Sequence, residues 1–151
     1  MITSIKTHVP ELVAAIAAAI GLVVYIVNAT TGYMAGQGVN ALLIGCTVVA
    51  LAGLVVRIIA QNRMPAVAAD ALLVIPEVLL IVSFAQFVLA HVRLAADIYF
   101  IPVNYPASEQ TALNVAIVGV VFYLVAIIAL IAKAFTAKDE SWSALLVDTV
   151  R

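Results

Sequence analysis

The sequence predicts an all-α, polytopic membrane protein, an antiparallel four-transmembrane-helix bundle that forms a single integral membrane domain over 1–151. Of the 151 residues, 66% are hydrophobic and only 10% are charged, whereas a soluble domain is about half apolar and about a quarter charged. The mean hydropathy is +1.24. A chain this short cannot hide such an apolar excess in one aqueous core, so we expect the surrounding solvent to be lipid.

Four apolar runs are long enough for transmembrane helices, and polar segments separate them. They lie at about 10–27, 40–59, 70–93 and 111–132. Pro10 and Glu11 open the first run, where proline suits the first turn of a helix and a carboxylate favours the positive end of the helix dipole. We therefore interpret Glu11 as a helix-start residue and not as a buried functional carboxylate. Asn40 suits the N-cap of the second span.

Small residues recur on one face of the second span. Ala41, Gly45 and Gly53 lie at intervals of four and eight residues, and small residues at such spacing let helices approach closely in lipid. We expect this face to serve helix packing. Cys46 is the single cysteine, so no intrachain disulfide can form, and no Cys/His cluster has the spacing of metal ligands. The sequence predicts no metal site and no cofactor.

Basic residues predict the orientation of the chain. Five of them belong to the N-terminal segment, the second loop and the start of the tail: Lys6, Arg57, Arg63, Lys133 and Lys138. The opposite side carries only Arg93, so the positive-inside rule places both termini in the cytoplasm. The cytoplasmic tail 138–151, with Trp142, is a short interfacial helix on the inner leaflet, a docking segment for a partner, or a disordered end.

The third span contains an ionisable group well inside an apolar run, Glu77, beside the helix-disturbing Pro76. Asp70, Glu77 and His91 recur at multiples of seven residues and share one stripe of a helix, whereas Gln86 lies on the opposite side. This helix therefore needs protein or water on more than one side. Glu77 lies about 10 Å beyond Asp70 along the helix axis. An unpaired carboxylate at that depth costs at least about 3 kcal/mol.

Two interpretations of Glu77 remain open. In the structural one, a hairpin of the second and third spans brings Arg57 within about one turn of Glu77, and the two side chains form an ion pair. In the functional one, Glu77 is a protonatable site in a transport path.

Two other polar residues of the third span are candidate site residues. His91 lies near the outer boundary, about 20 Å from Glu77, where an interfacial residue needs no special role; pH sensing is the alternative, because imidazole titrates near neutral pH. Gln86 is expected to hydrogen-bond to another span, with Asn114 and Tyr123 as candidate partners.

Strings in three parts of the chain resemble a known group of proteins. They are Asn28-Ala29-Thr30-Thr31-Gly32-Tyr33, Phe84-Ala85-Gln86-Phe87 with Ala90-His91-Val92-Arg93, and Gly119-Val120-Val121-Phe122-Tyr123-Leu124. Together they resemble small four-span bacterial membrane proteins that are uncharacterised. The resemblance implies a multi-pass four-helix bundle in a bacterial cell membrane, and it carries over no functional residues.

Three classes of function follow from these features. A non-enzymatic accessory or assembly subunit of a membrane complex is favoured by the small size and by polar faces that need protein neighbours. The alternative is a small homo-oligomeric transporter or channel that uses Glu77. A membrane enzyme is the weakest, because no catalytic constellation is visible. The expected partners are the lipid bilayer and either a membrane protein or a second copy. Nucleic acid is excluded by a net charge of −1 without a basic patch.

Overall fold

The computed structural model describes residues 2–60, 63–101 and 107–149 for the backbone and 8–60, 63–65, 67–101 and 107–136 for side chains, and all regular secondary structure within these ranges is helical. The helices are α1 (Ile2–Thr30), the short 3-10 helix η1 (Gly32–Gly36), α2 (Ala41–Ala60), α3 (Ala66–Phe100) and α4 (Ala107–Thr149). Each of the four α-helices contains a stretch long and apolar enough to cross a membrane. The all-α prediction is therefore confirmed for the described ranges.

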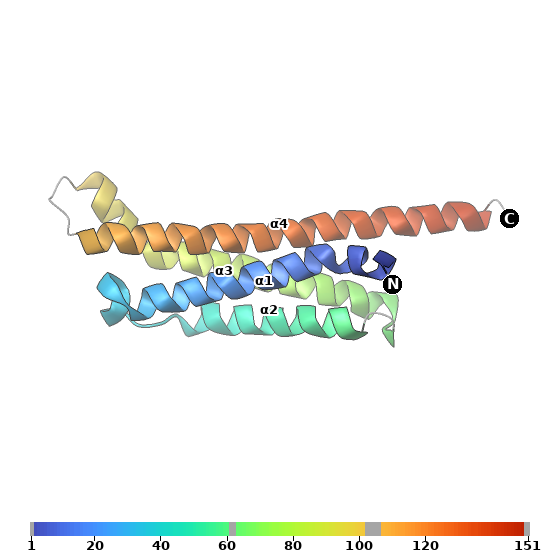
Figure 1. Ribbon diagram of the computed structural model, residues 1–151, viewed down its shortest axis with the longest axis horizontal. Coiled ribbons are helices and arrows are strands. Elements are labelled where there is room, and N and C mark those ends of the chain that lie inside the picture. Colours follow the sequence, from blue (N-terminus) through green and yellow to red (C-terminus); the bar gives the residue numbers. More distant parts are fainter. Residues whose placement is uncertain (1, 61–62, 102–106, 150–151) are drawn as a thin grey trace.

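Each predicted span coincides with one helix or lies inside a longer one. Asn40 caps α2 as predicted, because its Oδ1 accepts hydrogen bonds from the amides of Leu42 and Leu43 at 3.0 and 3.3 Å. The backbone of α4 continues as one helix to Thr149 and extends beyond the other helices (Figure 1). The side chains of the predicted tail, including Trp142, lie outside the described residues.

The connection between α1 and α2 turns at two glycines. Gly32 has a φ of 63° and Gly38 a φ of 81°, a left-handed region that glycine enters without steric cost. The segment 28–39 between the first two predicted spans is thus partly helical, since α1 continues to Thr30 and η1 follows it.

The helices pack in a closed ring in which α1 and α3 each contact both α2 and α4 (Figure 1). Buried residues recur at alternating intervals of three and four along each helix; in α2 they are Leu43, Thr47, Ala50, Leu54 and Arg57. An average interval of 3.5 residues keeps one face of a helix against its neighbours over many turns. The opposite faces expose valine, isoleucine and leucine side chains, as a lipid-facing exterior requires.

The packing is tightest around the fully buried ring of Phe87 on α3. Its centroid lies 5.1 Å from that of Tyr25 on α1 and 5.9 Å from that of Tyr123 on α4, both edge-on. Gly119 on α4 lies against the same ring, since a Cβ there would come within 2.5 Å of it. This glycine therefore lets α4 approach α3 closely.

The small-residue face predicted on α2 has two different environments. Gly53 packs against α3, where a Cβ on this residue would lie 3.0 Å from the Pro76 ring. Ala41 and Gly45 are exposed, and a Cβ on Gly45 would meet nothing within 4 Å. The part of this face that contains Ala41 and Gly45 thus points away from the rest of the described chain.

Candidate functional site

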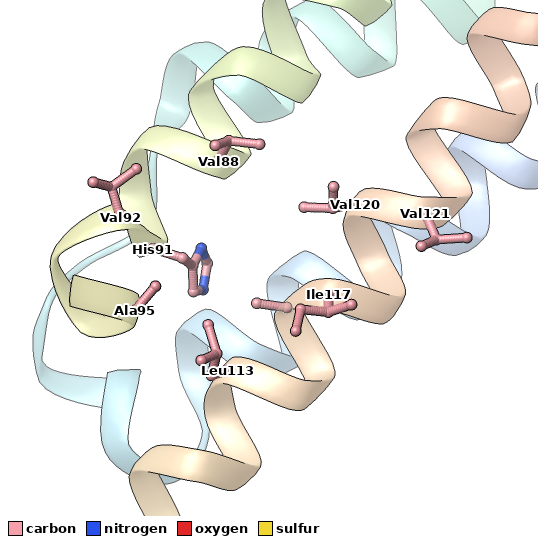
Figure 2. Close-up of a pocket in the computed structure, with 9 residues that line it drawn as sticks. Val88, His91, Val92, Ala95, Leu113, Ile117, Val120 and Val121 are labelled. Carbon is pink, nitrogen blue, oxygen red and sulfur yellow. The ribbon is translucent and has the colours of Figure 1, made fainter. Parts of the chain in front are cut away.

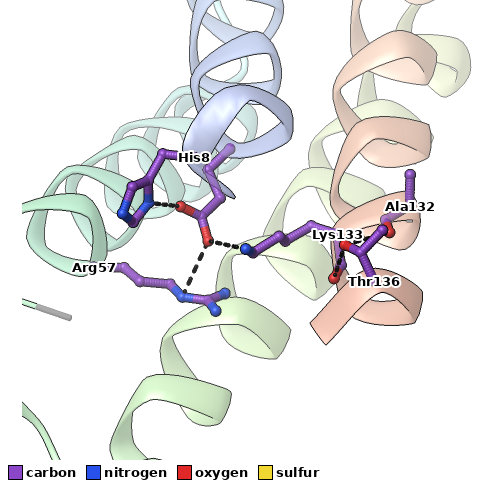
Figure 3. Close-up of polar contacts among 6 residues, drawn as sticks. His8, Arg57, Ala132, Lys133 and Thr136 are labelled. Atoms are coloured by element: carbon purple, nitrogen blue, oxygen red, sulfur yellow. Dashed lines mark hydrogen bonds and ion pairs between the residues drawn. The ribbon is translucent and has the colours of Figure 1, made fainter. Parts of the chain in front are cut away.

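A buried ionic cluster joins three helices at the end of the molecule where the chain begins. Glu11 on α1 is fully buried, and its Oε2 accepts a 2.7 Å hydrogen bond from Nδ1 of His8, one turn earlier. Its Oε1 lies 3.4 Å from Nε of Arg57 on α2 and 4.0 Å from Nζ of Lys133 on α4. Figure 3 shows His8, Arg57 and Lys133 converging from these three helices.

The structure corrects the interpretation of Glu11 as a helix-start residue. The helix begins at Ile2, and Pro10 lies inside it. Glu11 occupies the same buried stripe as Ala14 and Ala18, three and seven residues later. That spacing was the signal in the sequence: a carboxylate on the core face of an apolar helix needs a cationic partner.

Positive charge exceeds negative charge among the cluster's Glu11, Arg57 and Lys133. Arg57 and Lys133 are 4% exposed each, and each has a nitrogen atom within 4.0 Å of Oε1 of Glu11. The Glu11 Oε1 and the Arg57 Nε and Nη1 atoms are buried without a hydrogen bond in the described part of the chain, so the contact between Glu11 and Arg57 is ionic. Such a cluster holds α1, α2 and α4 together, because separating its charges in a low-dielectric interior is costly.

The predicted ion pair between Glu77 and Arg57 is wrong, because Arg57 pairs with Glu11 instead. Glu77 is half-buried on α3 and has no ion pair or hydrogen bond to a side chain within the described ranges. It lies next to Pro76, which packs on Gly53 of α2, so the carboxylate belongs to the section of α3 beside the middle of α2. The described side chains of this chain thus offer no ion-pair partner to Glu77.

A hydroxyl cluster that the sequence did not predict links three helices near the middle of the bundle. Thr47 on α2 donates to or accepts from Tyr123 on α4 at 2.8 Å, and it lies 2.9 Å from the hydroxyl of Ser83 on α3. All three residues are fully buried. Each hydroxyl thus has a partner inside the bundle, which removes the cost of burying it in an apolar environment.

Gln86 does bond to another helix, as predicted, but with a different partner. Its Oε1 accepts a 3.0 Å hydrogen bond from Nδ2 of Asn40 at the start of α2. The backbone amide of Asn40 in turn donates to the Tyr25 hydroxyl at 2.7 Å. The candidate partners lie elsewhere: Asn114 accepts from Gln110 on its own helix, and Tyr123 bonds to Thr47.

His91, which the sequence places near a membrane boundary, is buried inside the bundle. It is 5% exposed, and its Nε2 lies 2.9 Å from Nδ2 of Asn28 on α1. Its Nδ1 lies 3.0 Å from the backbone oxygen of Phe87, and Asn28 also donates to the backbone oxygen of Ala112 on α4 at 3.1 Å. His91 and Asn28 therefore join α1, α3 and α4 at the end of the bundle opposite to Glu11.

The candidate site residues thus fall into separate places. Arg57 belongs to the ionic cluster, Gln86 and His91 make separate contacts towards the other end, and Glu77 stands apart from all three. No three His, Cys, Asp or Glu side chains within the described ranges lie together as a metal site would require. The chain matches no protein-family model, no curated protein and no solved structure.

Proposed function

We propose that the protein is a multi-pass protein of a bacterial cell membrane, with four antiparallel transmembrane helices and both termini in the cytoplasm. The four long apolar helices support the membrane location. The orientation is supported by the basic residues, because Arg57 and Lys133 lie at the end of the bundle where α1 begins and beyond which α4 extends (Figure 1). Basic residues accumulate on the cytoplasmic side of membrane proteins.

Within that membrane, the protein acts as a non-enzymatic accessory or assembly subunit of a larger complex. The observation that carries this proposal is the contrast between two carboxylates. Glu11 faces cations from two neighbouring helices, whereas Glu77 has no cation within 4 Å among the described side chains. Since an unpaired carboxylate at membrane depth is costly, we infer that a neighbouring protein supplies the partner of Glu77.

The length of α4 adds a second argument for a partner. The helix has 43 residues and continues beyond the ends of α1, α2 and α3 (Figure 1). At 1.5 Å per residue, its last thirteen residues, 137–149, extend about 20 Å past Thr136, where the apolar stretch ends. A helix that leaves the bundle in this way offers a rigid contact for a subunit at the membrane surface.

The test is co-purification from native membranes under mild extraction, with identification of the proteins that remain bound. We expect a stoichiometric foreign protein with the wild type and its loss with Glu77→Gln. The matched control is Asp70→Asn, which removes an exposed carboxylate one heptad earlier on the same helix. Retention of the partner by Glu77→Gln, or equal loss with Asp70→Asn, would contradict a specific contact at Glu77.

The second candidate is a homo-oligomeric transporter or channel in which another copy of the chain lies beside Glu77. It is favoured by Ala41 and Gly45, which are exposed on α2 and would let a second helix approach closely. Recovery of a homo-oligomer without foreign protein would favour this function over the first. Proton flux in liposomes, compared between the wild type and Glu77→Gln, would then decide whether that assembly transports.

A further inference from the structure

Two cavities lie on either side of the contact between Asn28 and His91. The first, about 240 Å³, opens between α3 and α4, and His91 forms part of its otherwise apolar wall (Figure 2). The second, also about 240 Å³, lies between the end of α1, η1 and the start of α4. Asn28 lines it together with the hydroxyl-bearing residues Thr31, Ser108 and Thr111. The two side chains and the backbone of Ala112 thus lie between an apolar crevice and a second cavity whose mostly apolar wall includes hydroxyl-bearing residues.

The hydrogen bonds around this contact determine which atoms carry hydrogen. A carbonyl oxygen can only accept, so the backbone oxygen of Phe87 requires a hydrogen on Nδ1 of His91. The backbone oxygen of Ala112 requires that Asn28 present its amide nitrogen on that side. Because the same Asn28 nitrogen faces Nε2 of His91, Nε2 must be the acceptor. His91 is therefore neutral, with its hydrogen on Nδ1.

We propose that Asn28 and His91 form a proton-sensitive latch that joins α1 to α3 and α4 and opens when His91 is protonated. Protonation places a hydrogen on Nε2, so that two donors face each other. Rotation of the Asn28 amide would offer Oδ1 to the imidazolium, but it would also place that oxygen against the carbonyl oxygen of Ala112. In either orientation, α1 loses its hydrogen bond to α3 or to α4, and the wall between the two cavities is broken.

The surroundings of His91 offer no counter-charge that would hold the latch closed after protonation. At this end of the bundle, the packed elements carry the ionisable residues Tyr25 on α1, Tyr33 on η1, Arg93, Asp97 and Tyr99 on α3, and Glu109 on α4. None of these carboxylates within the described ranges lies within 4 Å of the imidazole. Thr31, Ser108 and Thr111, in the mostly apolar wall of the second cavity, provide polar groups on the side of the latch where Asn28 lies.

The experiment is hydrogen–deuterium exchange of the full chain in lipid nanodiscs at about pH 7.5 and about pH 5, with correction for the intrinsic pH dependence of exchange. We expect the segments around Asn28 and Ala112 to exchange about fivefold faster at the lower pH, the factor that one hydrogen bond of ordinary strength represents. His91→Gln should abolish this response. His8→Gln, which removes the chain's other histidine, should retain it.

A persistent response in His91→Gln, or no response in the wild type over this pH range, would overturn the latch. A second measurement does not depend on a variant. Imidazole nitrogen resonances of the wild type should report hydrogen on Nδ1 of His91 at about pH 7.5, where most free histidine is neutral. Hydrogen on Nε2 would contradict the arrangement from which the latch is inferred.

Discussion

Replacement of Glu11 by glutamine tests whether the ionic cluster holds the bundle together. The side chain keeps its size but loses its charge, so the buried Arg57 and Lys133 each lose their ionic contact with Glu11. At 3.4 and 4.0 Å, unit charges attract by about 4–5 kcal/mol each at an effective dielectric constant of about 20. Desolvation offsets most of this attraction in the intact cluster. When Glu11 loses its charge, the desolvation of the buried cations is no longer compensated by this attraction. We therefore expect Glu11→Gln to lower the free energy of unfolding by about 3–5 kcal/mol.

The assay is unfolding in mixed micelles by titration with a denaturing detergent, followed by circular dichroism. Glu77→Gln is the matched control, because it makes the same chemical change on a half-buried residue that has no ion pair in the described chain. We expect the control not to lower the stability of the isolated protein, because it removes a carboxylate that has no ion pair in the described chain and is costly at membrane depth. A pairing of Glu77 with Arg57 would have predicted the reverse order of the two variants.

A double-mutant cycle separates the ionic contact from other effects of substitution. Arg57→Met removes the guanidinium and leaves an apolar side chain in its place. The double variant Glu11→Gln/Arg57→Met should be more stable than the sum of the single effects predicts, by about 1–3 kcal/mol. Strict additivity, or a Glu11→Gln variant as stable as the wild type, would refute the cluster as a source of stability.

Two further substitutions test the packing and the hydroxyl cluster in the same unfolding assay. Gly119→Ala should destabilise the protein by about 1–3 kcal/mol, because its Cβ would come within 2.5 Å of a buried ring. The control Gly45→Ala, whose Cβ would meet nothing within 4 Å, should be neutral or slightly stabilising. Equal effects of the two substitutions would contradict the close approach of α4 to α3. Thr47→Val leaves the buried hydroxyl of Tyr123 without the 2.8 Å contact and should cost about 1–3 kcal/mol. The exposed Thr136→Val, which loses only bonds to its own helix, should cost less than about 0.5 kcal/mol.

The fold class was predictable because hydropathy and run length depend on the chain alone. The four runs each lie on one helix, and Asn40 is the N-cap that its position before an apolar run indicated. The start of α1 was not predictable by the same reasoning. Pro10 next to Glu11 is typical of a helix start, yet the helix extends eight residues further towards the N-terminus. The longer helix places His8 one turn before Glu11, where its Nδ1 lies 2.7 Å from the carboxylate, and the local signals of a helix start do not indicate this contact.

The sequence indicated which polar residues need a partner, but it did not indicate which residue each partner is. Gln86 was expected to bond across helices and does so, but its choice of Asn40 depends on the register between α2 and α3. Arg57 was assigned to the next helix in sequence, whereas its carboxylate comes from the preceding one. A polar side chain inside the bundle can meet any of the other three helices, as Thr47 of α2 meets Tyr123 of α4, and one sequence does not say which of them provides the partner.

The distribution of buried polar groups argues against conduction through a single copy of the chain. Arg57 and Thr47 are ten residues apart on α2, about 15 Å along the axis, and the buried side chains between them are apolar: Ala50, Leu54, Pro76, Leu80, Ala126 and Leu130. An ion crossing this dry section would lose its hydration without gaining a polar partner. Glu77 lies beside Pro76, on the outside of the same section. A transport path that uses Glu77 must therefore pass between copies, and a structural role for Glu77 equally requires a neighbouring protein. Both candidate functions depend on what lies against this side of α3.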